Sequence, residues 1–118
     1  MSIAAAQASA FGEEVVASEH VWAIRDAGGF PAPINPSGER AMPFWSCESR
    51  ALSIIGKVPA YRGFVPHRLS LAEFVTRWLP RLEEDGVLVG LNWSGQRATG
   101  YDISPAAVRV WIDNARAK

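Results

Sequence analysis

Hydrophobic positions recur every three or four residues between Ser70 and Gly86, the clearest pattern in the chain. This spacing places the side chains on one face of a helix. The apolar face comprises Leu71, Phe74, Val75, Trp78, Leu79 and Leu82. Ser70 and Glu73 have the spacing of a capping box, and Gly86 supplies a left-handed stop. Pro80 has no amide to give the carbonyl of Thr76, so we expect a kink or an irregular turn there.

Short runs rich in β-branched and aromatic residues predict about six strands. They cover residues 20–25, 30–34, 40–45, 64–69, 87–93 and 97–103. Apolar residues alternate along 87–93, which predicts a central strand. One face of that strand would hold Val87, Val89, Leu91 and Trp93. Pro31 and Pro33 remove backbone donors from the second run, which should therefore lie at an edge or be broken.

Helix-forming stretches and caps predict three further helices, about four in all. They are expected over residues 2–19, over 47–55 after a Ser46 cap, and after Ser104 and Pro105. We predict an α+β fold with a mainly antiparallel sheet, because hairpin turns are expected near both ends of the sequence. Residues 1–118 are expected to form a single domain. Gly12 weakens the first helix, so residues 1–12 are a candidate for a loosely attached N-terminal helix.

Composition excludes several classes of protein. Twelve basic and twelve acidic side chains cancel, so no excess positive charge is present to drive nucleic-acid binding. No window reaches about 18 uninterrupted apolar residues, which argues against a membrane span. A lone cysteine fits the reducing cytoplasm, where we place the protein. No cofactor is expected because no phosphate-binding glycine motif is present, and no metal because no ligand pair has a suitable spacing.

Three segments together resemble a known family. They are residues 21–26, Val-Trp-Ala-Ile-Arg-Asp; residues 42–45, Met-Pro-Phe-Trp; and residues 71–86, which contain Trp-Leu-Pro-Arg-Leu-Glu-Glu-Asp-Gly. The chain resembles domain of unknown function 2750, an uncharacterised bacterial family, from about residue 13 to residue 113. The resemblance implies a small α+β domain and assigns no activity, substrate or catalytic residue.

Cys47 is the sharpest catalytic candidate. It is predicted just inside a helix start, where the helix dipole favours the nucleophilic thiolate. Together with a histidine, His67 or His20, it would form the centre of a small hydrolase or thiol enzyme. The competing interpretation is a small buried apolar residue, which is the common role of a free cysteine.

Trp45 is the best candidate for a binding residue. Five tryptophans are many for 118 residues, and Trp45 is the one that periodicity constrains least, so we expect it to be exposed or to face a ligand. Phe44 precedes it, and Arg40 and Arg50 flank it in sequence as possible donors to an acidic partner.

These observations favour a non-enzymatic protein-binding or regulatory module that acts on another protein through the surface near Trp45. Two alternatives remain open. One is the small hydrolase or thiol enzyme at Cys47, and the other is a self-associating structural protein whose edge strands pair between copies.

Overall fold

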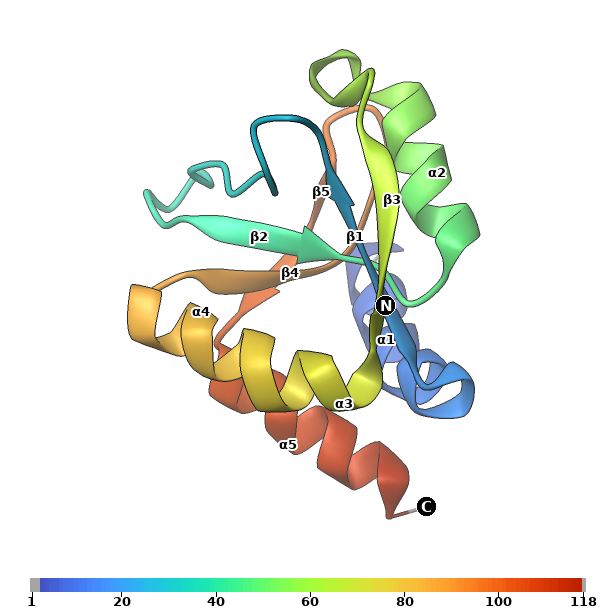
Figure 1. Ribbon diagram of the computed structural model, residues 1–118, viewed down its shortest axis with the longest axis vertical. Helices are drawn as coiled ribbons and strands as arrows, with labels where there is room; N and C mark the ends of the chain where they lie inside the picture. Colours follow the sequence, from blue (N-terminus) through green and yellow to red (C-terminus); the bar gives the residue numbers. More distant parts are fainter. Residues whose placement is uncertain (1–2, 118) are drawn as a thin grey trace.

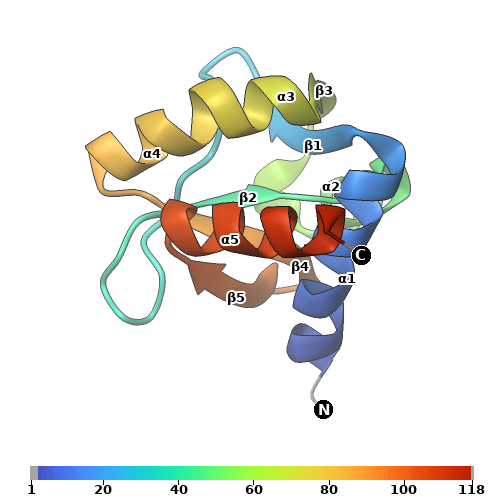
Figure 2. The ribbon, with the colours of Figure 1, turned by 90° about the horizontal axis from the view of Figure 1, so that it is seen from below.

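A computed structural model describes residues 3–117 of the chain, and the side chains from Ala6 onward. The elements in chain order are α1 (Ile3–Ser18), β1 (His20–Arg25), β2 (Ala41–Phe44), α2 (Glu48–Lys57), the 3₁₀ turn η1 (Pro59–Tyr61), β3 (Val65–Ser70), α3 (Leu71–Glu73), the π-helical turn η2 (Phe74–Trp78), α4 (Leu79–Asp85), β4 (Leu88–Ser94), β5 (Thr99–Ile103) and α5 (Pro105–Arg116). Helices α5 and α3–η2–α4 lie below the strands (Figures 1 and 2), and α2 packs beside β3 (Figure 1).

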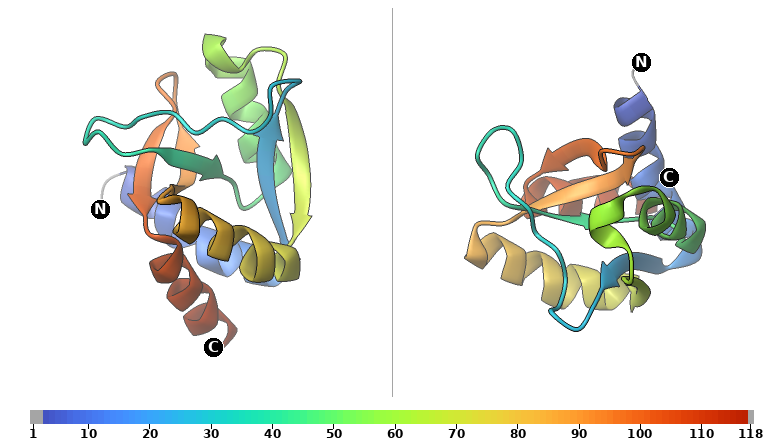
Figure 3. Two further views of the ribbon diagram at one scale, coloured as in Figure 1. Left: turned by 60° about the vertical axis from the view of Figure 1, so that its left-hand side comes forward. Right: turned by 90° about the horizontal axis from the view of Figure 1, so that it is seen from above.

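The α+β class is confirmed and most strand pairs are antiparallel, but the prediction of about six strands in one sheet is wrong. Within the described part of the chain, five strands form two small sheets, β1–β3 and β2–β4–β5. The β1–β3 and β4–β5 pairs are antiparallel, whereas β2 runs parallel to β4. Figure 3 shows β1 and β3 on one side of the molecule and β4 and β5 on the other, with β2 between them.

Residues 30–34 account for the missing strand. The turn after β1 closes as expected, since Asp26 and Gly29 exchange backbone hydrogen bonds of 3.1 Å. Beyond the turn the chain does not pair with β1, because Pro31 and Pro33 have no amide to donate to a ladder. Only Ile34 makes a bridge, and β1 pairs with β3 instead.

The consecutive elements α3, η2 and α4 form one long helix, which begins and ends as the sequence predicted. The Ser70 hydroxyl accepts a hydrogen bond of 3.0 Å from the amide of Glu73, and Gly86 adopts a left-handed φ of 69°. The irregular turn expected from Pro80 is also confirmed. It is the π-helical turn η2, where the amide of Leu79 bonds to the carbonyl of Phe74.

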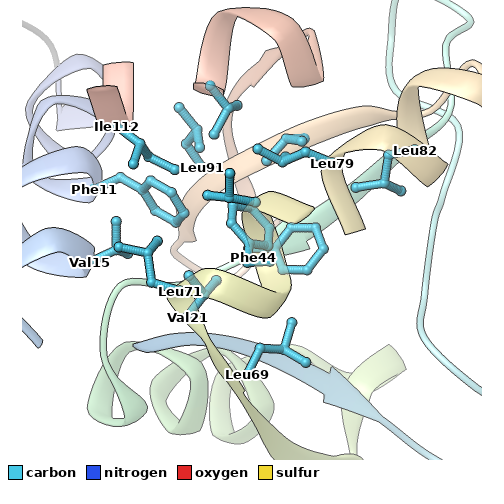
Figure 4. Packing of buried hydrophobic residues seen from close by; sticks show 14 of the residues in the cluster. Phe11, Val15, Val21, Phe44, Leu69, Leu71, Leu79, Leu82, Leu91 and Ile112 are labelled. Carbon is cyan, nitrogen blue, oxygen red and sulfur yellow. The ribbon is translucent and has the colours of Figure 1, made fainter. Parts of the chain in front are cut away.

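The main core lies between α1, α5, the long helix and the strands. Figure 4 shows Phe11, Val15 and Ile112 pointing toward Leu91 and Phe44. Helix α1 is packed against the core from Ala8 onward, since Ala8, Phe11 and Val15 are all buried. The two helices approach closely at Gly12, where a Cβ would make an ordinary contact of 3.6 Å with the carbonyl oxygen of Trp111 in α5.

The second core lies under α2. It is formed by Ile24, Ala41, Trp45, Ala51, Ile54, Val58, Tyr61 and Trp93. Trp93 was predicted to share a face with Val89 and Leu91, but those two side chains enter the main core. The β4–β5 register shifts between Leu91 and Ser94, and Asn92 adopts a left-handed φ of 49°. This bulge turns Trp93 to the opposite face of the sheet.

Candidate functional site

The most polar interior region lies where the parallel strands β2 and β4 end. Ligand sites in parallel sheets commonly lie beyond the carboxyl ends of the strands. Here β2 leads through Trp45 and Ser46 into α2, and β4 carries its bulge at Asn92. Ser46 and Asn92 are each only 1% exposed, so both require internal hydrogen-bond partners.

Asn92 links three segments through its side-chain amide. Its Oδ1 accepts a hydrogen bond of 2.9 Å from the backbone amide of Ser46. Its Nδ2 donates to the Ser46 hydroxyl and to the backbone carbonyl of Gln7, each at 3.0 Å. The left-handed backbone of Asn92 points this amide inward, and asparagine tolerates that conformation better than most residues. The bulge thereby fastens α1 and the segment before α2 to β4.

Glu14 and Arg50 form the charged part of the cluster. Arg50 donates from Nε to Glu14 Oε1 at 3.2 Å and from Nη2 to Oε2 at 3.0 Å, and from Nη1 to the Gln7 side chain. The Ser46 hydroxyl donates to Glu14 Oε1 at 2.5 Å. Burial alone would raise the pKa of Glu14, but hydrogen bonds from Arg50 and Ser46 and the charge of Arg50 hold it below the ordinary 4.5.

Acid should weaken the fold through Glu14. A carboxyl whose pKa is lower in the folded state stabilises the fold above its unfolded pKa, and this contribution is lost as the pH falls through the folded pKa. We therefore expect the loss to begin below about pH 4.5. The side chain is 40% exposed, so solvent screening limits the effect to about 1 kcal/mol.

Urea unfolding of the wild type and of Glu14→Gln, measured from pH 7 to pH 3, tests this expectation. The difference in stability between the two proteins should shrink as the pH falls. Asp85→Asn is the matched control, because it removes a 53%-exposed carboxylate from a surface ion pair. A difference that is constant with pH for Glu14→Gln would contradict the role of the carboxylate.

Two cavities flank Arg50. The first, about 250 Å³, lies between α2 and the end of β4 and is lined by Gln7, Ser49, Arg50, Ser53, Ile54, Lys57, Asn92, Trp93 and Ser94. The second is a wider, open hollow of about 590 Å³ lined by Glu14, Ala17, Ser18, Ser46, Cys47, Ser49 and Arg50. Arg50, predicted as a binding residue, therefore reaches both cavities.

Cys47 precedes α2 instead of lying inside it. The expected cap, Ser46, is turned inward to Glu14 and Asn92, so the helix begins one residue later and Cys47 occupies the cap position. Its sulfur lies 3.3 Å from the Ser49 hydroxyl. No hydrogen bond within residues 3–117 joins Cys47 to a histidine.

His67 belongs to another part of the molecule. It lies in β3 opposite Ala23, and its ring packs edge-on against Phe30 with centroids 5.3 Å apart. His20 lies at the start of β1, opposite Ser70. The structure thus pairs neither histidine with the Cys47 thiol.

The expectation that Trp45 is exposed is wrong. Trp45 and Phe44 are both 0% exposed. Trp45 exchanges backbone hydrogen bonds of 2.7 and 2.8 Å with Trp22, and its indole donates to the carbonyl of Trp93 at 2.9 Å. These long-range contacts could not be inferred from periodicity. The exposed indole is instead Trp111, at 38%.

Arg40 is separated from Arg50 by the length of β2. Its backbone carbonyl accepts from Leu88 at the start of β4, and its guanidinium donates to the carbonyl of Ala32 at 3.2 Å. The two arginines therefore lie at opposite ends of the parallel pair and do not line one groove.

Four members of the polar cluster, Gln7, Glu14, Ser46 and Asn92, were not predicted from the sequence as site residues. Asn92 gave one usable signal, since an amide between Leu91 and Trp93 in a strand buried on both faces requires a specific partner. Gln7 lies among alanines and Glu14 lies beside another glutamate on the same helix, and neither position gave such a signal.

Comparison with known proteins identifies one family. Residues 8–111 match the model of a family described as "Protein of unknown function (DUF2750)". No curated protein and no solved structure matches the chain. Over residues 3–117, no three acidic, histidine or cysteine side chains group as metal ligands. No described helix is long and apolar enough to span a bilayer.

Proposed function

The chain belongs to DUF2750, a family whose description gives no activity, and we propose that it is a non-enzymatic module that binds another protein over the outer side of α2. The observation that carries this proposal is the pair of cavities that meet at Arg50. Helix α2 also presents Leu52, which is 48% exposed and follows Ser49, a residue that lines both cavities, by three positions. An apolar contact next to polar hollows is typical of interface anchors.

The arrangement of the nucleophiles supports binding over catalysis. Nucleophilic catalysis by serine or cysteine uses an adjacent base within hydrogen-bond reach. The Ser46 hydroxyl is buried and already donates to Glu14, whose charge Arg50 neutralises. The Cys47 sulfur lies 3.3 Å from the Ser49 hydroxyl and also interacts with the Arg50 guanidinium, and neither of these groups can act as a base. The cluster serves to hold α1, α2 and β4 together.

Site-specific photocrosslinking in cells tests the proposal. A photoreactive residue replaces Leu52 in one variant and, as a matched control, Val110 in another, since Val110 is 54% exposed on α5. We expect the Leu52 variant to form a discrete product with one cellular protein and the Val110 variant to form none.

Two results would overturn the proposal. Equal crosslinking from both positions, or none from Leu52, would remove α2 as the binding surface. A product composed of two copies of this chain would favour the self-associating alternative, which sedimentation at several protein concentrations would then establish.

A further inference from the structure

The cavity between α2 and the end of β4 is positively charged in a protein of zero net charge. Arg50 and Lys57 line it, and no Asp or Glu does. Ser49, Ser53 and Lys57 follow one another at intervals of four residues, which places them along one side of α2. Figures 1 and 3 show the turn after β4 beside this helix. An anion that enters here meets cations and hydroxyl donors.

Both cations have donors to spare. Arg50 uses one N–H from each of its three nitrogens toward α1 and also interacts with Cys47, which leaves at least one of the five N–H groups of a guanidinium. Glu14 neutralises Arg50 from the side of the open hollow and does not line this cavity. The Lys57 side chain makes no hydrogen bond or ion pair with any residue in the described range. Its ammonium is therefore available to a carboxylate.

The size and walls of the cavity restrict the ligand. Its volume of about 250 Å³ is smaller than the roughly 300–1,000 Å³ of sites for drug-sized molecules. Ile54 and Trp93 supply apolar surface for a short methylene chain. A single acidic side chain fits this combination of small volume, apolar wall and two basic side chains.

We propose that this cavity binds the carboxylate of a Glu or Asp side chain from an acidic segment of a partner protein. The inference rests on the proposed function and adds the chemistry of the partner. Arg50 and Lys57 would contact the carboxylate, with the Ser53 hydroxyl as a further donor. The acidic residues next to it in the partner segment would lie along α2.

Titration of the isotope-labelled protein with an end-blocked hexaglutamate peptide tests this assignment by nuclear magnetic resonance. We expect saturable shifts of the Ser53 and Ser94 amides, weakened by added salt because the contacts are electrostatic. Lys57→Gln should weaken binding about tenfold, the effect of losing one charge-assisted contact of about 1.4 kcal/mol. Arg116→Gln, at an exposed position on α5, should bind as the wild type does.

The controls separate the competing explanations. Hexaglutamine should cause no saturable shifts, and equimolar inorganic phosphate should not displace hexaglutamate. Displacement by phosphate would reassign the cavity to a phosphate ligand, and equal binding by Lys57→Gln and wild type would overturn the proposal. If Lys57→Gln and Arg116→Gln unfold at the same temperature, misfolding does not explain the weaker binding of Lys57→Gln.

The outcomes also distinguish this inference from the proposed function. Crosslinking at Leu52 without peptide binding would retain the α2 interface and reject the acidic segment. Peptide binding in the cavity without crosslinking would establish the anion site and reject the proposed α2 protein interface.

Discussion

Replacing Trp45 with alanine is expected to lower the free energy of unfolding by about 3–5 kcal/mol, the usual cost of truncating a buried Trp. The side chain is fully buried in the second core, so the substitution leaves a large cavity between the strands and α2. It also removes the donor to the Trp93 carbonyl, which then lacks the indole hydrogen bond. Urea unfolding followed by circular dichroism measures the effect.

Two matched substitutions separate the contributions. Trp45→Phe keeps most of the apolar volume and should cost less than alanine, with much of its cost due to the lost hydrogen bond. Trp111→Ala removes the same side chain from a position that is 38% exposed and should cost about 1 kcal/mol or less. Equal losses for Trp45→Ala and Trp111→Ala would contradict the burial described for Trp45.

Replacing Gly90 with alanine should cost about 3 kcal/mol, at the upper end of the range for overpacking a core. A Cβ at Gly90 would lie 2.4 Å from Cε2 and Nε1 of the Trp93 indole, closer than real Cβ contacts occur. The indole would have to move, and its hydrogen bond of 2.8 Å to Asp102 would break. Thermal and urea unfolding measure the loss.

Gly56→Ala provides the control. Gly56 lies in α2 and a Cβ there would meet no atom within 4 Å, so alanine should stabilise the protein by about 0.5–1 kcal/mol. Adding Trp93→Leu to Gly90→Ala should show positive coupling, because the smaller side chain relieves the contact. Additive losses in the double variant would show that the clash with Trp93 is not the cause.

The packing of the Trp93 indole against Gly90 connects the fold to the candidate site. Gly90 and Gly100 leave room for the Trp93 indole, since a Cβ at Gly100 would also lie 2.9 Å from its Cδ1. Trp93 can cover them only because the bulge at Asn92 turns it to that face. The bulge in turn directs the Asn92 amide to Ser46 and positions the wall of the small cavity.

Local sequence patterns were sufficient to predict those helix ends, turns and strands that depend only on neighbouring residues. The Ser70 cap, the Gly86 stop, the irregular turn before Pro80 and the strand at residues 20–25 all follow from residues within one or two turns of each other. The strand at 87–93 was also correctly placed in the centre of its sheet, because its apolar residues require cover on both faces.

The candidate site was only partly accessible to sequence reasoning. Arg50 was predicted as a donor and does line both cavities. Its partners lie 36 and 43 residues away in α1, and the contact between Ser46 and Asn92 spans 46 residues. No periodicity reports such contacts. The interpretation of Trp45 was wrong for the same reason, since a bridge to Trp22 and a hydrogen bond to Trp93 bury it.

By itself, the sequence determined the helices, both ends of the helix between Ser70 and Gly86, the strand candidates and the absence of excess charge, because these depend on neighbouring residues or on simple counts. Only the tertiary structure decided that β2 runs parallel to β4, that the strands divide into two sheets, and which side chains share a cavity. Strand pairing and burial depend on contacts between distant residues, and one bulge is enough to move a side chain to the opposite face.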